Sequence, residues 1–316
     1  MFPDSSSAAH AEPTLLSESL SVEDVRAAVA RDKIDPWRAP DVSSGKGQSD
    51  ENFPVGSVLF APAMRSHVHA YYDFARFSDD VTDSDRLTPE EKVARLDAME
   101  DIVHGRAQAP DRKDARSAAR VREMLLRTGL PFEVATDLLV AFREDAVKSR
   151  YASQAELDLY CRYSANPVGR FLLGLHGESD RTFPASDALC TSLQILNHLQ
   201  DCQKDLLLLK RCYVPLDLLE AQGLGVEAVL ENTTSPSLRR VFDILLDETD
   251  RLNEEALGLL RHVRDRRMRM YCGAVVRLAH LLAARLRVGD PLAERVALTK
   301  ADFARAAVAA LGSWKN

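Results

Sequence analysis

Two helical segments that carry acids on one face constrain this chain of 316 residues more than any other feature. The first is Tyr71 to Asp83 (YYDFARFSDDVTD), and the second is Ser192 to Asp205 (SLQILNHLQDCQKD). Steps of three or four residues place side chains on the same face of an α-helix. The first polar stripe comprises Tyr72, Arg76, Asp79, Asp80 and Asp83, and the second comprises Gln194, Asn197, Asp201 and Asp205.

The apolar surroundings of these acids point to a metal site. A single acidic stripe is usually a solvated helix face, but carboxylates inside an apolar helix are costly unless they are neutralised. If the two stripes face one another, their carboxylates converge and need cations. Oxygen ligands of this kind suit Mg²⁺, which proteins typically hold with one or two carboxylates plus substrate phosphate oxygens. We therefore predict a Mg²⁺ site that accepts a diphosphate leaving group on a hydrocarbon.

The remainder of the chain predicts an all-α fold. Alternating β-branched runs are scarce, and Gly223 to Ala228 (GLGVEA) lacks the preceding strand that a dinucleotide site needs. Residues 1–48, rich in Ser, Ala, Asp and Pro, are predicted to be a disordered extension with one helix over 21–32, and residues 49–316 a single catalytic domain. The other expected helices are 63–81, 88–104, 111–128, 131–148, 153–163, 166–176, 236–262, 266–288 and 299–311.

Composition narrows the class of protein and its location. The net charge of −7 gives no reason to expect nucleic acid as a partner. The five cysteines form no C-x-x-C pair, which favours reduced thiols in a cytoplasmic protein. There is neither a secretory signal nor a run of about 18 apolar residues that would predict a membrane span. Peripheral contact with a membrane stays open.

The motifs resemble those of the head-to-head trans-isoprenyl diphosphate synthases, the family of squalene, dehydrosqualene and phytoene synthases. The resemblance rests on the two acid stripes, on RCYVP (211–215) and on YCRYS (160–164) with PVGR (167–170), and it runs from about Gly45 to near the C-terminus. GKGQSDENFPVGS, YSANPVGRFLLGLHGE and LQDCQKD are most similar to the bacterial hydroxysqualene synthase branch, which belongs to hopanoid biosynthesis. Lys204 supports that branch, because many squalene and phytoene synthases have an acid there. The apolar run 206–209 departs from the family pattern.

The resemblance implies an isoprenoid synthase fold, with helices around a central active-site cavity, and a reaction. Presqualene diphosphate would ionise with Mg²⁺, and water would capture the rearranged carbocation to give hydroxysqualene and diphosphate. Functional coupling to a presqualene diphosphate synthase and to a hydroxysqualene-reducing enzyme would follow. The implied metal ligands are Asp79, Asp80, Asp83, Asn197, Asp201 and Asp205; the substrate contacts are Arg76, Arg211, Tyr213, Gln194 and Phe171, with Tyr72 and Tyr151 near the reacting carbons.

Two alternatives remain beside this hypothesis. A squalene or phytoene synthase would condense two prenyl diphosphates itself, and relatives that make squalene directly quench the cation with hydride from NADPH. A non-enzymatic assembly factor of the same fold should have lost its aspartates, whereas Asp79, Asp83, Asp201 and Asp205 are all present. Gly169 and Gly174 could leave room for a long chain or simply allow helices to pack closely.

Overall fold

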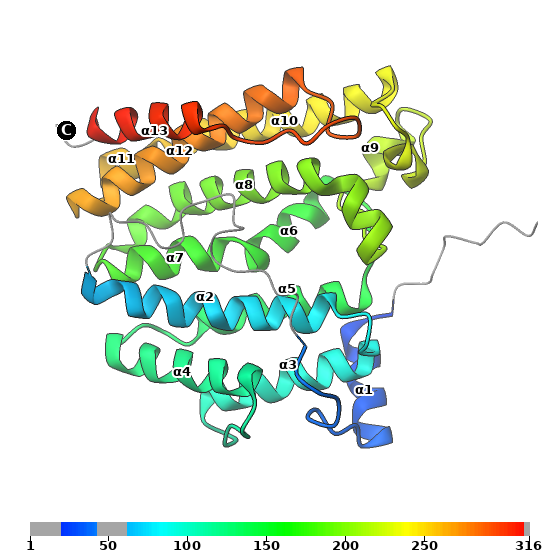
Figure 1. Ribbon diagram of the computed structural model, residues 1–316, viewed down its shortest axis with the longest axis vertical. Helices are drawn as coiled ribbons and strands as arrows, with labels where there is room; N and C mark the ends of the chain where they lie inside the picture. Colours follow the sequence, from blue (N-terminus) through cyan, green and yellow to red (C-terminus); the bar gives the residue numbers. More distant parts are fainter. Residues whose placement is uncertain (1–19, 43–61, 313–316) are drawn as a thin grey trace, which may run out of the picture.

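The computed structural model describes residues 20–42 and 62–312, and within these ranges the chain consists of helices joined by loops, without a strand (Figure 1). The helices are α1 (Val22–Asp32), α2 (Pro62–Asp83), α3 (Pro89–His104), α4 (Lys113–Thr128), α5 (Glu133–Val147), α6 (Gln154–Ser164), α7 (Asn166–Leu175), α8 (Phe183–Lys204), α9 (Leu216–Glu220), α10 (Pro236–Ala256), α11 (Gly258–His262), α12 (Arg266–Val288) and α13 (Lys300–Gly312). Shorter turns are η2 (Asp180–Thr182), η3 (Asp205–Leu209) and η4 (Val226–Leu230). The expected all-α class is confirmed.

Local chemistry explains where several helices begin and end. The Thr88 hydroxyl accepts from the Glu91 amide while the Glu91 carboxylate accepts from the Thr88 amide, so a complete capping box starts α3. Gly105 ends the same helix with φ at 75°, a conformation that glycine adopts without a steric penalty. The Ser153 hydroxyl caps α6 in the same way as Thr88 caps α3.

The helices stack along the long axis of the molecule, and each layer packs on the next (Figure 1). Helices α3 and α4 lie at one end and pack on α2 and α5, while α10, α12 and α13 cover α8 at the other end. Helices α6 and α7 lie between, because α5 packs on both and both pack on α8. The two acid-bearing helices, α2 and α8, therefore stand on opposite sides of this middle layer.

Residues 20–42 are packed on the helical domain, which differs from the expected loose attachment of the N-terminal segment. Helix α1 packs against α3, and Arg95 of α3, only 1% exposed, donates to three carbonyl oxygens at 2.7–3.1 Å. Composition could not reveal this clamp, because it joins residues more than 50 positions apart. The expected domain boundary near residue 48 lies outside the described residues. The carbonyls belong to Pro36, Ala39 and Pro40.

Two helices end differently from the sequence expectation. The helix expected over 236–262 is interrupted at Leu257, which separates α10 from α11. The second acid-bearing helix changes to a π-helical turn at Asp205, and Lys210 then adopts a left-handed conformation with φ at 60°. This turn exposes Leu207 and Leu208, which are 52% and 69% exposed. The apolar run 206–209, which departs from the family pattern, therefore lies in a π-helical turn at the end of the helix.

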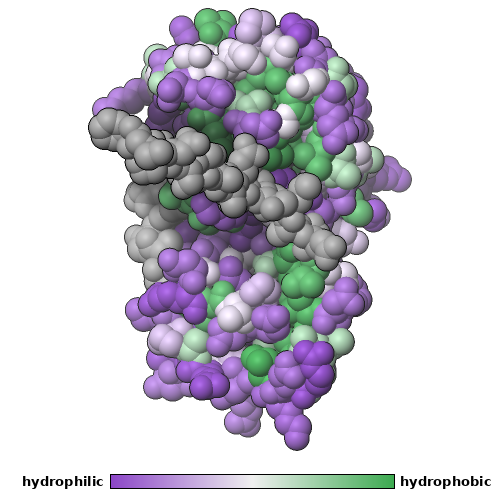
Figure 2. Space-filling model, turned by 90° about the vertical axis from the view of Figure 1, so that its right-hand side faces the viewer, coloured by the Kyte–Doolittle hydropathy of each residue, from purple (hydrophilic) through white to green (hydrophobic). Residues whose placement is uncertain are grey.

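The surface gives no sign of a segment that crosses a membrane. Among the described residues, no helix combines the length and the hydrophobicity that a transmembrane span requires. On the face shown in Figure 2, hydrophobic residues form separate patches among hydrophilic ones.

Candidate active site

The first acid stripe lies on α2 and is held by its own arginine. Arg76 Nη1 lies 2.9 Å from Asp79 Oδ2, and Arg76 Nη2 lies 2.7 Å from Asp80 Oδ1. The Asp80 side chain is 4% exposed, whereas that of Asp79 keeps 35% of its surface open. Burial, and next the neighbouring charge of Asp83, raise the pKa of Asp79 to about 7. This end of α2 therefore holds more negative charge than its arginine neutralises.

The second stripe is spread over the end of α8 and the start of η3. Asp201 is half-exposed and has Lys204 at 3.8 Å, whereas Asp205 is mostly buried, with its Oδ2 4.0 Å from His198 Nδ1. The other ring nitrogen of His198 lies 3.1 Å from the Gln194 amide nitrogen. If that amide donates, the ring proton sits on Nδ1, which faces Asp205. His198 is thus a buried, hydrogen-bonded part of this stripe.

Arg211 joins the two halves of the site. It follows η3, is 6% exposed, and its Nη1 donates to Asp83 Oδ1 at 2.7 Å. Its Nη2 donates to the Thr82 carbonyl oxygen at 3.1 Å, and its Nε donates to the Asp145 carbonyl oxygen at 3.0 Å. A single guanidinium therefore ties the C-terminal end of α2 to α5 and to the segment after the second stripe.

A cluster of aromatic rings lies beside Arg211. Tyr213 stacks on His198 with ring centroids 3.7 Å apart, and it lies 5.4 Å from Tyr151 and 5.3 Å from Tyr160. The three tyrosines are at most 6% exposed. Within the described ranges the buried Tyr151 hydroxyl has no hydrogen-bond partner, and Lys148 Nζ lies 4.4 Å from the centre of its ring. This cluster places electron-rich rings beside Arg211 and beside His198 of the second stripe.

Asp145 is the residue of this site that sequence reasoning missed. It lies in the last turn of α5, is 8% exposed, and its two oxygens accept from the hydroxyls of Tyr160 and Tyr213 at 2.7 and 2.8 Å. Burial raises the pKa of Asp145, and the Arg211 charge and the two phenols oppose that rise. Its sequence context, FREDAV, reads as an ordinary helix end, so no local signal marks it.

The predicted site residues differ in how accessible they are. Tyr72 and Gln194 are half-buried on the two stripes, whereas Tyr151 and Phe171 have no exposed surface. The Phe171 ring stacks on Tyr71 with centroids 4.0 Å apart. A β-carbon at Gly169 would lie 2.3 Å from the Ser186 hydroxyl, which confirms the close-packing role of this glycine.

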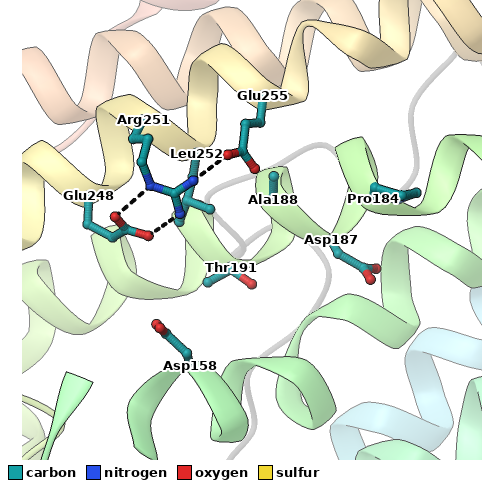
Figure 3. A pocket seen from close by; sticks show the side chains of 9 residues that line it. All are labelled: Asp158, Pro184, Asp187, Ala188, Thr191, Glu248, Arg251, Leu252 and Glu255. Carbon is teal, nitrogen blue, oxygen red and sulfur yellow. Dashed lines mark hydrogen bonds and ion pairs between the residues drawn. The ribbon is translucent and has the colours of Figure 1, made fainter. Parts of the chain in front are cut away.

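Two pockets in the described part of the chain lie away from the acid stripes. One, of about 270 Å³, lies between α6, α8 and α10 (Figure 3). Arg251 bridges Glu248 and Glu255 at its edge, and Asp158 points toward it from α6. Four of its nine lining residues are acidic, and its arginine, Arg251, is already paired with two of them, so this lining does not suit an isoprenoid diphosphate. The stripes, joined through Arg211, are the better candidate.

The donor set of the stripes fits a hard divalent cation. All six proposed ligands offer oxygen atoms, and burial, followed by the Asp83 charge, raises the pKa of Asp79, an effect that a bound cation opposes. Within residues 20–42 and 62–312, however, no group of three or more potential ligand side chains already converges. Arginine, lysine and histidine lie beside the acids instead. The expected ligand set therefore remains a proposal.

Comparison with known proteins identifies the family. The profile described as squalene/phytoene synthase matches residues 46–302. The chain is 40% identical to the hydroxysqualene synthase of Rhodopseudomonas palustris over 87% of this chain and 92% of that protein, and 39% identical to that of Zymomonas mobilis, over 85% and 90%. It is 30% identical to the phytoene synthase of Thermus thermophilus, over 78% and 83%.

Solved structures agree with this assignment. A crystal structure of squalene synthase from Alicyclobacillus acidocaldarius superposes with a TM-score of 0.65 at 29% identity, over 85% of this chain and 96% of that one. A dehydrosqualene synthase shares the fold, with a TM-score of 0.66 at 16% identity, over 93% and 96% of the two chains. The motifs, the helical architecture and these matches together show that the chain belongs to the squalene/phytoene synthase family.

Proposed function

We propose that this protein is a hydroxysqualene synthase, which converts presqualene diphosphate and water into hydroxysqualene and diphosphate. The observation that carries the proposal is the junction at Arg211, where the acid stripe of α2 meets the aromatic cluster beside the second stripe. The relatives named hydroxysqualene synthase, at 39–40% identity, support this branch over the phytoene synthases at 30% identity and below.

The two stripes would assist the departure of the diphosphate group from the substrate. Arg76 and Arg211 carry guanidinium groups that can donate paired hydrogen bonds to diphosphate oxygens. Mg²⁺, held by the oxygen donors of the stripes, would neutralise the charge that develops on the leaving group. Asp79, Asp80 and Asp83 on one side, with Asn197, Asp201 and Asp205 on the other, would provide the ligands.

The aromatic cluster serves the organic half of the substrate. Rings of Tyr213, Tyr160 and Tyr151 supply faces that stabilise a nearby cation, and their burial limits access of bulk water. Water must still reach the cation once, because the proposed product carries its oxygen. A cytoplasmic location with peripheral membrane contact, and functional coupling to enzymes that make presqualene diphosphate and reduce hydroxysqualene, belong to the same proposal.

The test is turnover by purified protein. With presqualene diphosphate and Mg²⁺, and without NADPH, we expect hydroxysqualene as the product. Asp83→Asn and Asp201→Asn should abolish turnover while the helical circular-dichroism signal persists, because each removes a charged ligand without removing volume. Absence of turnover together with activity on farnesyl diphosphate would support the condensing synthase instead. Full activity of both variants would refute the metal-site assignment.

A further inference from the structure

Asp145 is a buried carboxylate that the chemistry described so far does not use. Within the described residues no ion pair joins its side chain to a basic side chain. Its two oxygens instead accept hydrogen bonds from Tyr160 and Tyr213. Burying a carboxylate is expensive, and partial neutralisation by two phenols and the nearby Arg211 charge offsets only part of that cost.

The two phenols that bind Asp145 belong to the aromatic cluster. Tyr160 lies 5.2 Å from Tyr151 and 5.3 Å from Tyr213, and Tyr213 stacks on His198. A phenol that donates its proton to a carboxylate becomes more electron-rich, because hydrogen bonds in a low-dielectric interior polarise their partners. Asp145 therefore increases the negative potential on the rings of Tyr160 and Tyr213.

The geometry also keeps the carboxylate from reacting. Both oxygens of Asp145 are occupied by phenolic hydrogens at 2.7 and 2.8 Å. A cation that formed on the far side of the rings would experience the negative charge without contact to the oxygens that could trap it as an ester. The negative charge of Asp145, shielded by the two phenol hydroxyls, can thus stabilise a carbocation without forming a covalent bond to it.

We propose that Asp145 is a positioning residue of this site, whose carboxylate orients the hydroxyls of Tyr160 and Tyr213 and makes their rings stabilise the carbocation left after diphosphate departs. The inference rests on the proposed function and deepens it, since it assigns the group that tunes the aromatic cluster. Arg211 donates its hydrogen bond to the backbone carbonyl of Asp145 and not to the carboxylate. That bond survives a change of the side chain.

Asp145→Asn tests the inference, because it keeps the shape and removes the charge. We expect kcat on presqualene diphosphate to fall at least about tenfold, which corresponds to loss of a stabilisation felt in the transition state. KM, and the Kd of inorganic pyrophosphate with Mg²⁺, should stay within about twofold of wild type, because interactions with the ground state are retained. Asp137→Asn, the same substitution two turns earlier on α5, is the matched control and should leave kcat unchanged.

A charge-specific probe separates this role from a merely structural one. A protonated isoprenoid tertiary amine mimics the cation, and its neutral carbon isostere does not. With pyrophosphate and Mg²⁺ present, Asp145→Asn should bind the amine about tenfold more weakly and the isostere equally well, because only the charged probe experiences the lost charge. Equal loss for both probes would show a structural role and overturn the inference.

The remaining outcomes are also decisive. If Asp145→Asn does not fold, Tyr160→Phe removes one of the two hydrogen bonds without changing ring size, and it should lower kcat with little change in KM. Unchanged kcat in that variant, or in a folded Asp145→Asn protein, overturns the inference while the proposed function stands. If the wild type itself does not turn over presqualene diphosphate, the proposed function and this inference fail together.

Discussion

Replacement of Arg211 should destabilise the protein more than replacement of almost any other charged residue. Its guanidinium makes three hydrogen bonds, to the Asp83 carboxylate at 2.7 Å and to the carbonyl oxygens of Thr82 and Asp145 at 3.1 and 3.0 Å. Arg211→Met keeps much of the apolar volume and removes all three bonds. The carboxylate and both carbonyls then lose their donor at a nearly dry position.

The expected loss in free energy of unfolding follows from these contacts. Breaking a buried ion pair by removing one partner costs about 3–5 kcal/mol. The Asp83 side chain is 24% exposed, which lets water compensate part of this cost. Each buried acceptor left unpaired adds about 1–3 kcal/mol, although such effects are not additive within one network. We therefore expect about 3–5 kcal/mol for Arg211→Met and about 1–2 kcal/mol for Arg211→Lys, which keeps the charge.

Urea unfolding followed by far-ultraviolet circular dichroism measures both values. Arg127→Met is the matched control, because the Arg127–Glu123 pair is exposed, and its loss should change stability by less than about 1 kcal/mol. The Kd of inorganic pyrophosphate in the presence of Mg²⁺ should rise in both Arg211 variants. An Arg211→Met protein as stable as the Arg127→Met control would refute the view that this guanidinium holds the site together.

Three further predictions test other parts of the structure. Burial and Asp83 raise the pKa of Asp79 from 3.8 to about 7, so in metal chelator the wild type should lose stability between about pH 4 and pH 7 relative to Asp79→Asn; thermal unfolding that shows equal slopes for both would contradict this. Gly169→Ala should cost about 1–3 kcal/mol in urea unfolding, because its β-carbon would overlap the Ser186 hydroxyl, and a neutral result would show that the helices can part. Arg95→Met should make residues 20–42 the first site of limited proteolysis, and an unchanged digestion pattern would disprove the clamp.

Local features of the fold and site were predictable from the sequence. The spacing of Arg76, Asp79 and Asp80 sets ion pairs three and four residues apart, which any helix brings together. The capping box at Thr88 likewise depends only on residues within one turn. Because periodicity and caps are short-range properties, helix positions and both acid stripes could be inferred without a structure.

Long-range contacts explain what could not be predicted. Asp145 reaches Tyr213, which is 68 positions away, and nothing in the α5 sequence signals that pairing. Phe171 belongs to an apolar segment expected to line the cavity, but its stack on Tyr71 buries it completely. Arg95 looks like a surface residue of an amphipathic helix until the N-terminal carbonyls surround it. Such contacts depend on which helices pack together and in what orientation, and the periodicity of a single helix does not encode this packing.

The central claim, that water captures the carbocation, is tested most directly by the origin of the product oxygen. Purified protein would be given presqualene diphosphate and Mg²⁺ in ¹⁸O-enriched water, without NADPH, and the product would be analysed by mass spectrometry. The account predicts hydroxysqualene whose hydroxyl carries the isotope in proportion to the solvent. A hydrocarbon product that forms only when NADPH is added, and that contains no ¹⁸O, would contradict it.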